Sequence, residues 1–140
     1  MYAPHRGATA VRTRIETPDI NFKKDNILQA SCQSALQKDE TMEGSIPLVS
    51  GSASLKCKEL FLTITNSHAR EAVTVIVDLP GGVKVNEARG QILTGEIHAH
   101  NTFSSPTLVT PQVFDVSCGS SQLNLILHPA SVAAITLVIS

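Results

Sequence analysis

Apolar and polar residues alternate with a period of two through most of the second half of the chain, which predicts β-strands. The segment 60–65 carries apolar side chains on both faces, and in 73–79 every second residue is valine or leucine. The stretch 83–93 reads as one bent strand or a strand pair, with Gly90 as the candidate for a bulge. The segments expected to form strands are 8–16, 60–65, 73–79, 83–93, 112–116, 123–128 and 132–139.

Turn residues separate these strands at short and even intervals. The polar segment 66–71 has the length of a hairpin connection, and Pro-Gly-Gly at 80–82 turns the chain. Many short strands with such spacing are typical of a sandwich or a barrel, and the helical pattern that a β/α barrel requires is missing. The sequence therefore predicts an all-β fold, an antiparallel two-sheet β-sandwich.

The segment 18–45 departs from the strand pattern. Asp25 and Asn26 are suited to cap a short helix in which Leu28, Cys32 and Leu36 recur at every fourth position. Its polar flanks are almost as typical of a mobile surface insertion, so both alternatives stay open. In the preceding strand, 8–16, the arginines share one face, which we interpret as a solvated sheet face.

A long connection, 93–111, separates two of the expected strands. Gly95, Asn101, Pro106 and Pro111 indicate a shaped loop rather than a strand, and loops of this length are uncommon unless they are functional or packed onto another surface. Asn101 can satisfy backbone groups within it. Two apolar residues of this loop, Phe103 and Val109, are expected to anchor it to the domain. A crossover between two sheets is the natural place for such a loop.

The same loop carries a family resemblance. It contains Leu-Thr-Gly at 93–95, Ala-His-Asn-Thr-Phe at 99–103, and Val-Thr-Pro at 109–111. With further matches at 1–8, 48–54, 60–66 and 129–131, this ordered set resembles the C-terminal domain of α-L-arabinofuranosidases of glycoside hydrolase family 51. The resemblance covers most of the chain and fails only over roughly 18–45.

The resemblance implies a jelly-roll-like sandwich that accompanies a catalytic (β/α)₈ barrel. Enzymes of the family are retaining hydrolases that remove terminal α-L-arabinofuranosyl groups from arabinan and arabinoxylan, and many are oligomers. No position here matches their catalytic glutamates. The chain thus resembles the sandwich alone, as a domain, a fragment or a split reading frame: residues 1–7 form a leader from the barrel, and 8–140 form the C-terminal β-sandwich with a variable insertion at about 18–45. We expect it to be inactive alone.

Its expected partner is a catalytic barrel, in cis or in trans, with a homo-oligomer through the parent enzyme as a second association. A companion domain has one surface that meets protein rather than water, so we expect an apolar patch formed by the leader 1–7 and the loop 95–111. The candidate interface residues are Gly95, Ile97, His100, Asn101, Phe103, Pro106, Leu108 and Pro111.

Composition limits the other partners. A net charge of −1, with 16% charged residues, argues against nucleic acid or an anionic membrane surface. No apolar run is long enough for a membrane span, and the first six residues lack the apolar region of a signal peptide. Three cysteines without a close pair, Cys32, Cys57 and Cys118, favour small apolar thiols in a reducing compartment over a disulfide framework. We expect a cytoplasmic location and three free thiols.

The candidate chemistry is sparse. Glu87 follows Asn86, as the acid/base glutamate of the resembled barrel follows an asparagine, but a retaining glycosidase needs two carboxylates about 5 Å apart, and we interpret Glu87 as a surface charge. His98 and His100 would share one side of an extended segment and, with His128 or Glu96, could hold zinc; no further ligand spacing supports such a site. We expect no catalytic residue, no cofactor and no metal.

Two other classes of β-sandwich remain as alternatives. A carbohydrate-binding module would display aromatic rings for stacking on sugars, but this chain has no Trp, one Tyr and four Phe. An immunoglobulin-like interaction domain would also be all-β, although the His-Asn-Thr-Phe loop and the leading segment have no reason to occur in it.

Overall fold

The computed structural model describes residues 2–23, 43–119 and 121–140, and it confirms the all-β prediction. Besides the strands it contains one short 3₁₀ helix, η1 (Ala3–His5). The helix considered for 25–40 lies outside the described residues. Within the described ranges, no helix has the length and apolar character needed to span a membrane.

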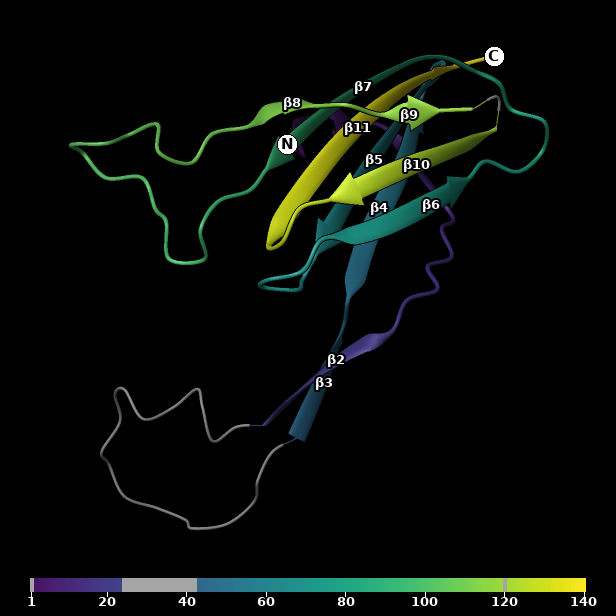
Figure 1. Ribbon diagram of the computed structural model, residues 1–140. Helices are drawn as coiled ribbons and strands as arrows, with labels where there is room; N and C mark the ends of the chain where they lie inside the picture. Colours follow the sequence, from purple (N-terminus) through teal and green to yellow (C-terminus); the bar gives the residue numbers. More distant parts are fainter. Residues whose placement is uncertain (1, 24–42, 120) are drawn as a thin grey trace.

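Two antiparallel sheets stack face to face, and a two-stranded ribbon extends from them (Figure 1). The larger sheet has six strands in the order β1-β4-β5-β11-β7-β8, the smaller has the order β6-β10-β9, and β2 pairs with β3 in the ribbon. The strand bounds are β1 (Thr9–Val11), β2 (Asp19–Lys23), β3 (Glu43–Pro47), β4 (Val49–Lys56), β5 (Glu59–Asn66), β6 (Val73–Asp78), β7 (Val85–Leu93), β8 (Gln112–Phe114), β9 (Ser117–Cys118), β10 (Gln122–Leu127) and β11 (Ser131–Ile139).

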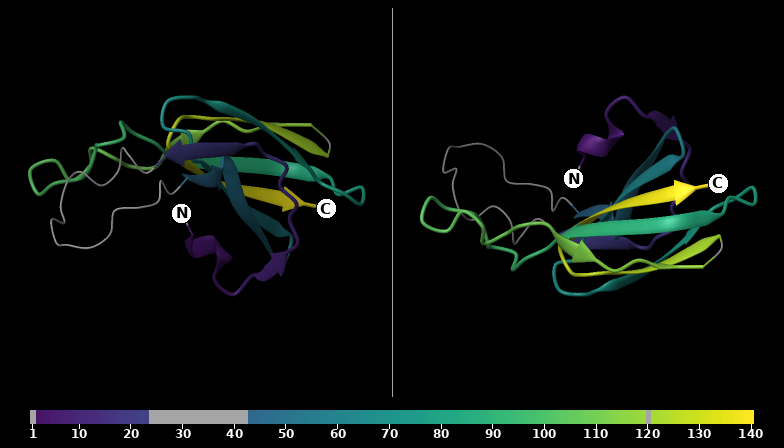
Figure 2. Two further views of the ribbon diagram at one scale, coloured as in Figure 1. Left: turned by 90° about the horizontal axis from the view of Figure 1, so that it is seen from below. Right: turned by 90° about the horizontal axis from the view of Figure 1, so that it is seen from above.

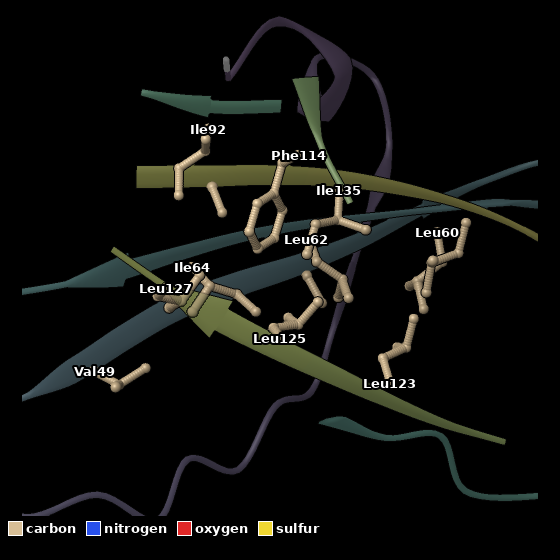
Figure 3. Close-up of a cluster of buried hydrophobic side chains, with 13 residues drawn as sticks. Val49, Leu60, Leu62, Ile64, Ile92, Phe114, Leu123, Leu125, Leu127 and Ile135 are labelled. Atoms are coloured by element: carbon tan, nitrogen blue, oxygen red, sulfur yellow. The ribbon is translucent and has the colours of Figure 1, made fainter. Parts of the chain in front are cut away.

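The core lies between the two sheets and is built by alternate residues of the central strands (Figure 3). Leu123, Leu125 and Leu127 of β10 are fully buried, while the residues between them are exposed. In the facing sheet, Ile135 pairs with Leu62, so both side chains point to the same interior. Burial of each such side chain stabilises the fold by roughly 1.5–3 kcal/mol, which fixes the two sheets against each other.

Gly90 is not the bulge that the sequence suggested. It pairs regularly with Ile135 of β11 and Phe114 of β8. A Cβ atom at position 90 would lie 2.5 Å from the Phe114 carbonyl oxygen and 2.8 Å from the Val116 side chain, so glycine is needed for close approach. The irregularity of the β7–β11 ladder lies instead between Val138 and Ile139. The stretch 83–93 contributes one strand, β7.

Two connections run differently from the expectation. The segment 66–71, expected to close a hairpin, joins β5 to β6, and these strands belong to different sheets. The neighbours of β5 within its own sheet are β4 and β11, so β6 is free to begin the opposite layer. Conversely, the long loop after β7 was expected to cross between sheets, but it leads to β8, which pairs with β7. The crossing there occurs between β8 and β9.

The first expected strand, 8–16, is shorter than its sequence pattern suggested. Only Thr9–Val11 pairs with β4, as β1. Beyond it the chain leaves the sheet, because the Thr17 hydroxyl accepts a hydrogen bond from the backbone N–H of Val49 and holds the chain beside the start of β4. Arg14 forms an exposed ion pair with Glu16, which agrees with the solvated face. The segment 18–45 then contributes β2 and part of β3.

Two of the three cysteines lie in the described residues, and both are free and exposed rather than packed as small apolar residues. Cys57 occupies the turn between β4 and β5 with φ of +56°. This left-handed conformation is one that glycine or asparagine adopts more readily, so the tight turn stores local strain. Cys118 ends β9, and Cys32 lies outside the described residues.

Candidate interaction surface

On the outer face of the six-stranded sheet, the two central strands carry one charged residue, Glu59 at the start of β5. On β11 the residues that alternate with the core are partly exposed and uncharged: Val132, Ala134, Thr136 and Val138. On β5 the outer-face residues Phe61 and Thr63 are themselves buried. A sheet face that met only water would carry polar and charged residues, so this face is suited to contact protein.

The leading segment already covers part of this outer face. Figure 2 shows the N-terminal turn on the side of the six-stranded sheet opposite to β6 and β10. The imidazole of His5 bridges two buried hydroxyls: its Nδ1 lies 2.7 Å from the Ser54 Oγ of β4, and its Nε2 lies 2.8 Å from the Thr63 Oγ1 of β5. The ring also meets Phe61 edge to face, with the ring centroids 6.3 Å apart.

His5 therefore fixes the leading segment on the sheet. Sequence analysis did not identify this role, because His5 is far from its partners along the chain. A signal was present, however: the segment 60–65 has apolar weight on both faces, which indicates a strand covered on both sides. The small sheet covers one face, and the segment around His5 covers the other.

We expect His5→Ala to destabilise the domain by about 1–3 kcal/mol, because it leaves the Ser54 and Thr63 hydroxyls buried without a partner. The amides at 2–8 should then exchange faster with deuterium. The matched control is His98→Ala, since His98 is exposed in the long loop and should change stability by less than about 0.5 kcal/mol. Equal stability of the two variants would contradict the anchoring role.

The loop between β7 and β8 extends beyond the end of the sandwich as an arm (Figure 1). Asn101 closes it: the side-chain amide donates to the Val109 carbonyl oxygen at 2.9 Å, and its Oδ1 accepts from the Val109 N–H at 2.7 Å. At the tip, the backbones of Thr102 and Ser105 exchange two hydrogen bonds of 3.2 Å. The backbone-satisfying role predicted for Asn101 is confirmed.

The tip of this arm presents an aromatic ring to solvent. Phe103 has a relative exposure of 108%, so it does not anchor the loop, and that part of the prediction is wrong. Val109, which is half-buried, does pack at the base of the loop. The two residues differ because the turn 102–105 directs Phe103 away from the domain. The two hydrogen bonds between the Asn101 side chain and the Val109 backbone instead hold Val109 at the base of the loop.

A shallow hollow of about 210 Å³ lies where the arm joins the sheet. Leu93 and Val132 line it from the outer face, while Gly95, Ala99 and Val109 line it from the loop. Ile97 stands at its rim and is 59% exposed. The hollow thus lies where the uncharged outer-face residues of β11 end, at Val132, beside the arm.

The candidate interface residues fall into three groups. Gly95 and Ile97 line the hollow, whereas Asn101 holds the arm closed. The others are exposed along the arm: His100, Phe103, Pro106, Leu108 and Pro111. Val113 of β8, which sequence analysis did not select, is also highly exposed. The loop therefore exposes three large apolar side chains, those of Ile97, Phe103 and Leu108.

The side chains considered for chemistry lie apart from one another in the part of the chain that the structure describes. Glu87 accepts a hydrogen bond of 2.7 Å from Arg89 Nε, and this bond and the positive charge hold the pKa of the carboxyl below its ordinary value. A general acid requires the opposite shift. His98, His100, His128 and Glu96 do not gather, and no group of three ligands occurs within the described ranges.

The chain matches the α-L-arabinofuranosidase C-terminal domain family over residues 1–131. It resembles the family 51 arabinofuranosidase from Xanthomonas axonopodis pv. citri, with 26% identity and a TM-score of 0.75, covering 97% of this chain and 24% of that one. No curated protein matches it.

Two further solved structures support the fold. The α-L-arabinofuranosidase from Thermotoga maritima shares 24% identity at a TM-score of 0.63, covering 91% of this chain and 25% of that chain. The thermostable family 51 enzyme from Thermotoga petrophila shares 20% identity at a TM-score of 0.65, covering 94% and 26%. The chain thus spans about a quarter of these enzymes, in which homologous domains sit together with a catalytic barrel. It belongs to the family of C-terminal domains of α-L-arabinofuranosidases.

Proposed function

We propose that this chain serves as the non-catalytic C-terminal domain of an α-L-arabinofuranosidase that releases terminal α-L-arabinofuranosyl groups from arabinan or arabinoxylan. The observation that carries the proposal is the family match over residues 1–131. In this role the domain packs against a catalytic (β/α)₈ barrel and stabilises the assembled enzyme.

Two structural features support a docking surface for the barrel on one side of the domain. The leading segment lies on the outer face of the six-stranded sheet through His5, and the uncharged strip of β11 lies on that same face. The hollow beside Leu93 and Val132 extends this surface to the arm. A partner seated there would cover the strip and accept apolar side chains of the arm. Covering several hundred Å² of apolar surface at about 25 cal/mol per Å² contributes several kcal/mol before the costs of association.

The test uses the catalytic barrel of a family 51 α-L-arabinofuranosidase, expressed separately. We expect the chain alone to release no arabinose from p-nitrophenyl α-L-arabinofuranoside, because no position of its sequence matches the two catalytic glutamates that the family carries in the barrel. Mixed with the barrel, it should elute as a complex, and its melting temperature should rise.

Two results would contradict the companion-domain proposal. One is turnover by the purified chain that disappears in Glu87→Gln, which would place catalysis in the sandwich. The other is a barrel that changes neither the elution volume nor the melting temperature of the chain. Retention of the chain on immobilised arabinan, in that second case, would favour the carbohydrate-binding alternative.

A further inference from the structure

The smaller sheet ends in an edge strand that is long and unprotected. Within residues 2–23, 43–119 and 121–140, β6 pairs only with β10. It has six residues, whereas the edge strands β1 and β8 of the other sheet have three each. Natural edge strands are usually shortened or protected by lysine, proline or a bulge, and β6 carries none of these.

Hydrogen-bonded and non-hydrogen-bonded residue pairs alternate between β6 and β10, and this alternation shows which backbone groups of β6 face its free edge. Leu79 donates its N–H to the Ser121 carbonyl oxygen at 3.0 Å, and the neighbouring positions Asp78 and Gln122 are paired. Because antiparallel pairs alternate between bonded and non-bonded, Val73, Val75 and Val77 direct their N–H and C=O groups to β10. The intervening residues, Thr74, Ile76 and Asp78, direct theirs away from it.

The apolar side chains on both faces of β6 are also partly or largely exposed to solvent. Val73, Val75 and Val77 point into the sandwich but stay partly exposed, while the leucines that they face across the ladder in β10 are fully buried. On the opposite side of the same sheet, Ile76 and Ile126 are 58% and 64% exposed. One added strand beside β6 would cover both sets.

We propose that β6 is the pairing edge of a homodimer, in which β6 of a second copy adds antiparallel to it and the two small sheets become continuous. Strand β6 is self-complementary about a two-fold axis at Val75. In that register Val75 faces its own copy, Thr74 faces Ile76, and Val73 faces Val77.

This register also suits the charges and the apolar side chains. Asp78, the charged residue of β6, would face Ala72 rather than a second carboxylate. Because Ile126 is paired with Thr74 in the ladder, the incoming Ile76 would extend a row that already contains Ile126. The dimer therefore uses a surface separate from the arm and the outer face, and it does not depend on the proposed enzyme partner.

The first test measures the mass of the 140-residue chain by analytical ultracentrifugation over a wide range of concentration. We expect a concentration-dependent dimer. Ile76→Pro removes an outward N–H without removing a bond to β10, and it should weaken dimerisation by about tenfold or more, since each dimer loses two hydrogen bonds. Ile76→Thr keeps the N–H and should retain most of the affinity. Circular dichroism and melting temperature establish that both variants are folded.

The second test reads the register by cross-linking in a background where Cys32, Cys57 and Cys118 are serine. Val75→Cys should oxidise to a covalent dimer, because the two copies of position 75 face each other. Val73→Cys should not, since its own copy would lie about 13 Å away along the strand. If Ile76→Pro fails to fold, this cross-linking decides the matter alone.

Three outcomes would overturn the proposal. A chain that stays monomeric at every concentration contradicts it, and would be expected if β6 instead accepts a strand from another protein. A dimer that folded Ile76→Pro leaves intact, but that Phe103→Ala abolishes, would place the contact on the arm. Equal cross-linking of positions 73 and 75, or none at either, would exclude the two-fold axis at Val75.

Discussion

Replacing Asn66 by leucine is expected to lower the free energy of unfolding by about 3–5 kcal/mol and the melting temperature by roughly 10 °C or more. Asn66 is 1% exposed. Its side-chain amide donates to the carbonyl oxygens of Glu71 and His128, both at 2.9 Å, and its Oδ1 accepts from the His68 N–H at 2.9 Å. Leucine has a similar volume but can satisfy none of these backbone groups.

The size of this effect follows from where the bonds lead. The carbonyl of Glu71 belongs to the connection that carries the chain from β5 to β6, and that of His128 to the connection that carries it from β10 to β11. Asn66 thus ties together two of the connections that carry the chain between the sheets, β5–β6 and β10–β11. Leaving a buried backbone group unpaired costs about 1–3 kcal/mol. The substitution would remove the side-chain partner of three backbone groups at once: the carbonyls of Glu71 and His128 and the N–H of His68.

Asn86→Leu is the matched control, because Asn86 is exposed and its side chain has one long hydrogen bond, of 3.3 Å, from Ser140. It should change stability by less than about 0.5 kcal/mol. Chemical denaturation of both variants, with the melting temperatures, measures the difference. A loss below about 1 kcal/mol for Asn66→Leu would mean that solvent or the backbone replaces these bonds.

Phe103→Ala is expected to weaken binding of the catalytic barrel by about ten- to a hundredfold while leaving the stability of the isolated domain within about 0.5 kcal/mol. The ring is fully exposed on the arm, so its removal costs the domain no internal contact. The hydrogen bonds that close the arm involve Asn101 and the turn at 102–105, not the Phe103 side chain. A rigid arm binds with little loss of conformational entropy, which makes an aromatic tip effective as an anchor.

Titration calorimetry with the separately expressed barrel gives the affinity, and thermal unfolding of the free variant gives its stability. Ser104→Ala is the control, because Ser104 is the exposed neighbour of Phe103 on the same turn. Unchanged affinity for Phe103→Ala would remove the arm from the proposed docking surface and leave only the outer face of the larger sheet. A lowered melting temperature would instead show that the ring supports the domain itself.

The sequence by itself determined the elements that follow from local periodicity. Alternation places Leu123, Leu125 and Leu127 on one face of a strand whatever its neighbours are, and the structure buries all three. Gly95, Asn101 and the two prolines likewise indicated the shaped loop, because their backbone preferences are properties of single residues. The ordered motifs around this loop were sufficient to identify the family.

The tertiary structure alone decided which strands pair and where the connections lead. The same period of two fits a hairpin or a passage between sheets, so the segment after Asn66 and the loop before Pro111 were both assigned to the wrong kind of connection. The contacts of His5 with Ser54 and Thr63 span some fifty residues, and the exposure of Phe103 depends on a turn held by its neighbours. These features arise from burial and hydrogen bonding between distant segments, which a local pattern of side chains does not encode.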